Sequence, residues 1–186
     1  MAVIAVTGDI GAGKSTVSKL LAEKLNYKYF NADEIAKNLW NDDNIKNLAA
    51  SHWGGEIFDV EGIIIKSKIS DYIFSRKDDW NFCNSILHPS VMKILSEKVN
   101  DDAVIEIPLI FEAGKKNWID KIIYVSAPFN IRAERCKIQR GWNVDELLRR
   151  EKFLLNRDKK ISMSDYVINN KDTLNELKNL IKELNL

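Results

Sequence analysis

Apolar and polar residues follow two alternating patterns along the chain. Short apolar runs rich in β-branched or aromatic residues predict parallel strands at residues 2–6, 27–30, 104–110, 122–125 and 166–168. Elsewhere apolar residues recur every three or four positions, which predicts amphipathic helices at residues 17–25, 65–73 and 91–99. Thr173 and Glu176 form a capping-box pattern before one more helix. The alternation predicts an α/β fold, a five-stranded parallel sheet flanked by helices.

The first apolar run leads into a glycine-rich loop at residues 8–16, Gly-Asp-Ile-Gly-Ala-Gly-Lys-Ser-Thr, which matches the phosphate-binding pattern G-x-x-x-x-G-K-[ST]. The order strand, loop, helix lets backbone N–H groups and a helix N-terminus face a phosphate. The alternatives are an ordinary glycine-rich turn and a dinucleotide-binding loop. The latter needs G-x-G-x-x-G, whereas the glycines here are spaced G-x-x-G-x-G.

This loop predicts how ATP and Mg²⁺ would be held. Lys14 would reach the β- and γ-phosphates, and the Ser15 hydroxyl would ligate Mg²⁺. The backbone groups expected to bind the phosphates of ATP are those of Gly11, Ala12, Gly13, Lys14, Ser15 and Thr16.

Two carboxylates stand out beside the strands. Asp33 follows the second apolar run at a strand-to-helix corner, on the side of an open α/β sheet where ligands bind. An Asp at such a corner is also a common helix N-cap. Glu106 lies inside the run 104–110, which Pro108 breaks near its end. A buried carboxylate needs a partner, for which Lys14, a magnesium-bound water or a substrate group could serve.

The remaining segments predict a division within one kinase domain. The core comprises residues 1–36, 101–128 and 161–186, and residues 37–100 form a mostly helical region expected to cover the substrate. In that region Pro89 is predicted near the first position of a helix that carries the apolar stripe at 91–99. Residues 129–160 are predicted to form a lid. From 132 to 160 the chain has ten basic and five acidic residues, and arginines there could neutralise charge on a transferring phosphoryl group.

Composition narrows the class of partner and compartment. The chain has 186 residues, 45 % of them hydrophobic, with a net charge of +1, so no global field favours nucleic acid or an anionic membrane. Cys83 and Cys136 form no metal-binding pair, and no apolar run is long enough to span a bilayer. A cytoplasmic protein is expected, a monomer or small homo-oligomer, without nucleic-acid or membrane partners.

Other phosphate-loop proteins fit less well than a small-molecule kinase. A GTPase would have an Asn-Lys-x-Asp motif, whereas residues 170–173 read Asn-Lys-Asp-Thr. A motor-type ATPase would have an apolar strand that ends in Asp beside Mg²⁺, and neither later strand is expected to end in this way.

Four further motifs occur in order along the chain: residues 31–36 (Asn-Ala-Asp-Glu-Ile-Ala), 86–91 (Ile-Leu-His-Pro-Ser-Val), 108–112 (Pro-Leu-Ile-Phe-Glu) and 164–170 (Ser-Asp-Tyr-Val-Ile-Asn-Asn). Together with the loop they resemble the motifs of the dephospho-CoA kinase family over nearly the whole length. The chain also departs from the family pattern. Asn31 replaces the first Asp of Asp-Ala-Asp, Ile64-Ile65-Lys66 replaces Leu-Asp-Arg, and Gln139 and Leu154 stand where the family has a lid Arg and Gln.

The resemblance implies transfer of the ATP γ-phosphoryl group to the ribose 3′-hydroxyl of dephospho-CoA, with ATP and dephospho-CoA as partners and Mg²⁺ as cofactor. It implies that Asp33 accepts the hydroxyl proton, that Lys14 and Arg140 act on the phosphoryl group, and that His88, Lys66 and Glu112 are candidates for the acceptor pocket. Two alternatives stay open: a related kinase for a nucleoside monophosphate or another small alcohol, and a nucleotide-binding regulatory module without turnover.

Overall fold

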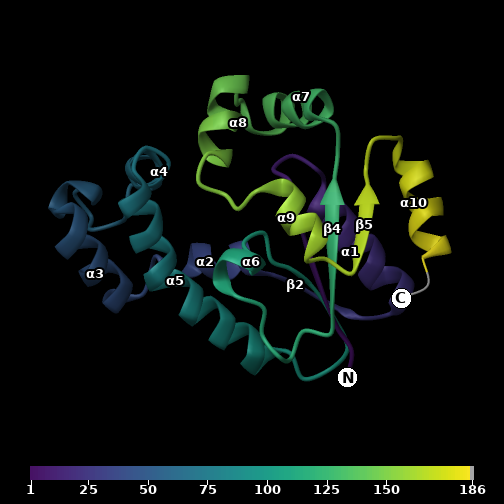
Figure 1. Cartoon of the computed structure of the whole chain (residues 1–186). Helices are drawn as coiled ribbons and strands as arrows, with labels where there is room; N and C mark the ends of the chain where they lie inside the picture. Colours follow the sequence, from purple (N-terminus) through teal and green to yellow (C-terminus); the bar gives the residue numbers. More distant parts are fainter. Residues whose placement is uncertain (185–186) are drawn as a thin grey trace.

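The computed structural model describes residues 1–184, and within them a five-stranded parallel sheet has the order β2-β3-β1-β4-β5 (Figure 1). The strands are β1 Val3–Gly8, β2 Lys28–Asn31, β3 Ala103–Glu106, β4 Lys121–Ser126 and β5 Tyr166–Asn169. Neighbouring strands pair in parallel, with Val3 opposite Ala103 and Gly8 opposite Val125. The α/β fold predicted from the sequence is confirmed.

Helices cover both faces of this sheet. They are α1 Lys14–Leu25, α2 Ala32–Leu39, α3 Asp43–Trp53, α4 Lys66–Ile73, α5 Lys77–Lys98, α6 Ile110–Ala113, α7 Phe129–Arg140, α8 Val144–Glu151, α9 Arg157–Ser162 and α10 Leu174–Glu183, with a short 3₁₀ helix, η1, at Gly55–Ile57. The capping box predicted for the last helix is present, because the Thr173 and Glu176 side chains bond reciprocally to the backbone.

Alternate residues of the strands divide the core into two layers, because successive side chains in a strand point to opposite faces. On one face Val3 and Ala5 pack against Leu95 of α5. On the other face Ile4 and Val6 pack with α1 and α10, whose buried residues include Leu21 and Ile181.

A third apolar cluster lies away from the sheet. It joins α3, η1, α4 and α5 through buried residues that include Ile45, Trp53, Ile57, Ile69 and Leu87. Figure 1 shows α3 and α4 on the left, beyond the sheet, and α7 and α8 above the carboxyl end of β4. The carboxyl ends of the strands therefore lie between these two groups of helices.

The third strand is shorter than the apolar run predicts, because β3 ends at Glu106 instead of continuing to residue 110. Ile107 still donates its N–H to the Val6 carbonyl at 2.9 Å, but Pro108 has no N–H with which to continue the ladder. Glu106 is thus the last residue of the strand, at the edge where the phosphate loop begins.

The position predicted for Pro89 is wrong. It lies inside α5, which begins at Lys77, twelve residues before the proline. The apolar stripe continues towards the N-terminus through the buried residues Trp80, Cys83 and Leu87. Packing of this stripe stabilises the helix on both sides of the proline. Pro89 deprives the Ser85 carbonyl of its usual donor, and its ring crowds the same carbonyl, so packing must outweigh both effects.

None of the helices within residues 1–184 is long and apolar enough to cross a membrane.

Candidate active site

The phosphate loop adopts a conformation that only glycine accommodates at two positions. Gly11 and Gly13 have φ angles of +76° and +89°, in the left-handed region. A Cβ on Gly13 would lie 2.4 Å from Nδ2 of Asn170, which donates to the Ala12 carbonyl at 2.7 Å. Gly13 is also the N-cap of α1, and it has no side chain to occupy the first amides of the helix. The loop is therefore held from outside, and Gly11, Gly13 and Lys14 line a cavity.

Lys14 lies across the loop in this structure. Its Nζ donates to the carbonyl oxygens of Asp9 at 3.0 Å and Gly8 at 3.3 Å. Burial lowers the pKa of Lys14, while the nearby carboxylates of Glu106 and Asp33 act in the opposite direction. A phosphate group would supply the negative charge that this buried ammonium needs.

Ser15 contacts the carboxylate at the end of β3. Its Oγ donates to Oε1 of Glu106 at 2.9 Å, and Glu106 is buried. A hydroxyl and a carboxylate beside a phosphate-binding loop are the hard oxygen ligands that Mg²⁺ prefers. No group of three or more His, Cys, Asp or Glu side chains within residues 1–184 could hold a metal by itself. Mg²⁺ would therefore share phosphate oxygens and water, as it commonly does.

Glu106 differs from what the sequence suggests for its partners. They are Ser15, Tyr29 and Asn31, rather than Lys14, although Lys14 lies close enough to be affected by its charge. Neither β3 nor β4 ends in Asp, as expected, but β3 ends in another carboxylate beside the loop, Glu106. The sequence does contain a signal for this carboxylate, because Glu106 lies two residues before Pro108. The run at 104–110 is otherwise apolar, however, and does not indicate where the strand ends.

Asp33 lies at the start of α2, directly after β2. Asn31 is the N-cap of α2, because its Oδ1 accepts from the backbone N–H of Asp33 at 2.8 Å and of Glu34 at 3.3 Å. The alternative that Asp33 caps this helix is therefore wrong. Its side chain is exposed and lines the same cavity as Lys14. An uncommitted carboxylate at this place could orient a hydroxyl group and accept its proton.

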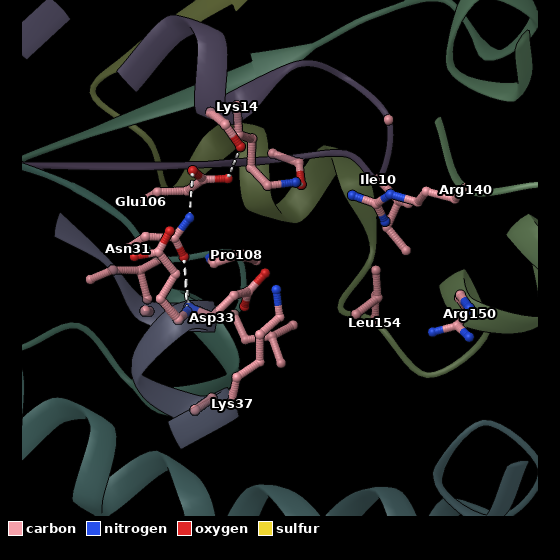
Figure 2. Close-up of a pocket in the computed structure, with 18 of the residues that line it drawn as sticks. Ile10, Lys14, Asn31, Asp33, Lys37, Glu106, Pro108, Arg140, Arg150 and Leu154 are labelled. Atoms are coloured by element: carbon pink, nitrogen blue, oxygen red, sulfur yellow. Dashed lines mark hydrogen bonds between the residues drawn. The ribbon is translucent and has the colours of Figure 1, made fainter. Parts of the chain in front are cut away.

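A cavity of about 850 Å³ joins these groups to residues 129–160. Figure 2 shows Lys14, Asp33 and Glu106 on one side of it, and Arg140, Arg150 and Leu154 on the other. The predicted site residues that line it are Gly11, Gly13, Lys14, Ser15, Thr16, Asp33, Lys66, His88 and Arg140.

Two of the predicted site residues lie elsewhere. Ala12 is fully buried, and its amide donates to the Asp9 carbonyl at 3.2 Å, so in this structure it is committed within the loop. Glu112 is not among the residues that line the cavity. Its Oε1 accepts from the backbone N–H of Leu155 at 3.0 Å, and its buried Oε2 has no hydrogen-bond partner in the part of the chain that the structure describes. Its charge opposes the effect of burial, which lowers the pKa of His88.

The arginines of residues 129–160 differ in their contacts. Arg140 and Arg150 stack on Trp142, with 4.7 and 4.0 Å from each guanidinium carbon to the ring centroid. Arg150 also donates to Glu146 at 2.6 Å and to Ser70 of α4 at 2.8 Å. The sequence did not single out Arg150, whose position in the cavity depends on contacts between distant segments.

A sequence model of the dephospho-CoA kinase family matches residues 2–176. The chain belongs to this family. It is 36 % identical to a dephospho-CoA kinase of Fusobacterium nucleatum over 180 residues, which are 94 % of this chain and 92 % of the relative. A dephospho-CoA kinase of Carboxydothermus hydrogenoformans is 30 % identical over 92 % of this chain and 87 % of its own length.

Solved structures agree with this fold. A Thermus thermophilus protein superposes with a TM-score of 0.76 at 27 % identity, covering 97 % of this chain and 94 % of that one. A shikimate kinase of Acinetobacter baumannii has a TM-score of 0.60 at 16 % identity, covering 98 % and 90 % of the two chains, and shows a shared fold. Membership of the dephospho-CoA kinase family makes this chain an ATP-dependent kinase that phosphorylates an alcohol group, and the resemblance found in the sequence is confirmed.

Proposed function

We propose that this chain transfers the γ-phosphoryl group of ATP to the ribose 3′-hydroxyl of dephospho-CoA, giving coenzyme A and ADP. The observation that carries the proposal is the shared cavity of the phosphate loop and Asp33. A phosphoryl group held by Lys14 and an alcohol beside Asp33 would meet in this one cavity. Such positioning is the main requirement of phosphoryl transfer.

Each group at the loop has a proposed task. The amides of the loop and Lys14 bind the β- and γ-phosphates and offset charge that develops in the transition state. Ser15 and Glu106 fit Mg²⁺, which when bound between the protein and the phosphates would neutralise their charge. Asp33 orients the acceptor hydroxyl and takes its proton.

The two helical segments have proposed tasks as well. Residues 37–100 form the acceptor-binding region, in which Lys66 and His88 line the cavity and would contact dephospho-CoA. Residues 129–160 form the lid, from which Arg140 approaches the transferring group. Lid closure would exclude water, which otherwise competes with the alcohol for the phosphoryl group.

The test is a coupled assay of ADP formation across acceptors: dephospho-CoA, nucleoside monophosphates, shikimate and no acceptor. We expect turnover with dephospho-CoA to exceed the others by at least about 100-fold in kcat/KM, because a site built to hydrogen-bond its substrate rejects analogues that leave its polar groups unpaired. Preference for another alcohol would favour the related-kinase alternative. ATP binding by titration with no turnover on any acceptor would favour a regulatory module.

A further inference from the structure

Glu106 accepts hydrogen bonds from three side chains on two different elements, α1 and β2. Its Oε1 accepts from Oγ of Ser15 on α1, and its Oε2 accepts from the Tyr29 hydroxyl at 2.9 Å. Oε2 also accepts from Nδ2 of Asn31 at 3.2 Å (Figure 2). The side chain is only 4 % exposed. A buried carboxylate with three donors is fixed in place, and each donor is fixed relative to it.

Asn31 uses both ends of its amide. The oxygen caps α2 by accepting from the backbone N–H of Asp33, and the nitrogen donates to Glu106 and to the Tyr29 hydroxyl, both at 3.2 Å. An aspartate would cap the helix as well as asparagine does, but it could not donate to Glu106. The contact with Glu106 therefore accounts for an amide at this position, where the family pattern has an acid.

These contacts form one connected path from the phosphate loop to the acceptor side of the cavity. It runs from the Ser15 hydroxyl through Glu106 and Asn31 to the backbone of Asp33. We propose that Asn31 is a positioning residue that acts through Glu106 to hold Asp33 in place relative to Ser15. The inference rests on the proposed function, because Asp33 and Ser15 belong to that mechanism.

The physical reason is the placement of charge. Asn31→Asp would put a second carboxylate within hydrogen-bond distance of a buried one, and like charges in such a place repel strongly. Glu106→Gln removes the charge beside Ser15 and leaves two amides facing each other. In Asn31→Asp/Glu106→Gln a donor and an acceptor face each other again, with their roles exchanged. The double variant keeps the cap on α2, and Tyr29 can donate to the new carboxylate.

The experiment is a double-mutant cycle of Asn31→Asp and Glu106→Gln, measuring kcat and KM with ATP and dephospho-CoA. We expect each single variant to lower kcat by about tenfold or more, with smaller changes in KM, because misplacing a reacting group mainly slows the chemical step. The double variant should turn over at least about tenfold faster than the product of the two single losses. Losses that simply multiply would overturn the inference.

The same cycle is run on the affinity for ATP with Mg²⁺, by titration without acceptor, and on the melting temperature. Coupling of at least about threefold in affinity is expected through Ser15. If wild-type protein binds ATP but does not phosphorylate dephospho-CoA, the proposed function fails, and the affinity cycle alone decides the inference. Recovery of the melting temperature without recovery of kcat or affinity would make the pair a stabilising contact only and would also overturn it.

A matched control is Asp42→Asn, the reverse exchange at the N-cap of α3. The Asp42 side chain accepts from the amides of Asn44 and Ile45, and the residue is not among those lining the cavity. Both residue types cap helices well, so we expect kcat within about twofold of wild type. A loss equal to that of Asn31→Asp would show that cap exchange alone disturbs the enzyme, and the inference would fall.

Discussion

The two walls of the cavity hold their functional groups in different ways. On the wall formed by the phosphate loop and β3, Lys14 and Ser15 bond to groups within the sheet edge, and Asn170 fixes the loop backbone from behind. On the wall formed by residues 129–160, Arg140 rests on the face of Trp142. The first wall is held by hydrogen bonds, whereas on the second wall Arg140 is held by stacking and Arg150 by both stacking and hydrogen bonds.

Under the proposed function, the difference follows from the task of each wall. The phosphate loop would bind the same charged groups in every cycle, so a geometry fixed before binding would lower the free energy that ordering costs. An arginine that approaches only in the closed complex must be able to leave its resting contact. A cation–π contact at an exposed site is worth about 0.5–1 kcal/mol, which a phosphoryl group can readily outcompete.

The largest expected effect comes from Asp33, which lies on the same side of the cavity as the phosphate loop. Asp33→Asn should lower kcat by about 10²- to 10⁴-fold, because an amide cannot accept the hydroxyl proton, while ATP affinity stays nearly unchanged. Since Asn31 caps α2, the melting temperature should change little. The measurement is kcat with dephospho-CoA together with ATP titration on the same variant.

Glu34→Gln is the control for this variant. It removes a neighbouring carboxylate from the same first turn of α2, and we expect a change in kcat below about threefold. Near-normal turnover of Asp33→Asn, or an equal loss in Glu34→Gln, would exclude Asp33 as the base.

The next effect tests the role of Arg140, which stacks on Trp142. Arg140→Ala should lower kcat by roughly 10²-fold, since an arginine that stabilises the transferring group can supply 10³ or more in related phosphoryl transfers. Arg150→Ala should cost less, because this guanidinium is already bonded to Glu146 and Ser70.

Arg149→Ala serves as the comparison. Its guanidinium bonds to Glu146 and Asp71, and it is not among the residues that line the cavity, so kcat should stay within about threefold of wild type. If Arg149→Ala or Arg135→Ala shows the 10²-fold loss instead, Arg140 is only a surface charge, and the match of residues 129–160 to the lid motif of the family is shifted.

The contrast between the walls also explains what the sequence could predict. The spacing of Gly8, Gly13 and Lys14 determines a loop by local backbone chemistry, so the loop and its strand were predicted correctly. The contacts of Arg150 with Ser70 and of Glu112 with Leu155 join segments more than 40 residues apart, and no local pattern encodes them. The end of β3 is an intermediate case. The apolar run at 104–110 predicts the strand, but it does not indicate which residue is the last to pair.

A smaller effect would sharpen the account of the metal. Ser15→Ala should raise the Mg²⁺ concentration needed for half-maximal rate and lower kcat by about tenfold, with a weaker effect on ATP binding. Ser18→Ala is a suitable comparison, because Ser18 is a buried serine on the same helix and outside the cavity lining. An unchanged Mg²⁺ titration in Ser15→Ala would remove this hydroxyl from the metal site.

The smallest effect concerns Glu146, whose carboxylate accepts hydrogen bonds from Arg149 and Arg150 of α8. Hydrogen bonds from Arg149 and, with a smaller contribution, Arg150 lower the pKa of Glu146. A carboxylate whose folded pKa is depressed stabilises the protein above its unfolded pKa, about 4.3, and this contribution is lost as the pH falls through the folded value. Glu146→Gln should therefore lower the melting temperature by about 1–3 °C at pH 7, the scale of partly exposed ion pairs, and the difference should shrink below pH 4. Melting curves of both proteins between pH 3 and 7 test this. A difference that is independent of pH would mean that Glu146 contributes through packing, and that the arginines keep their places without its charge.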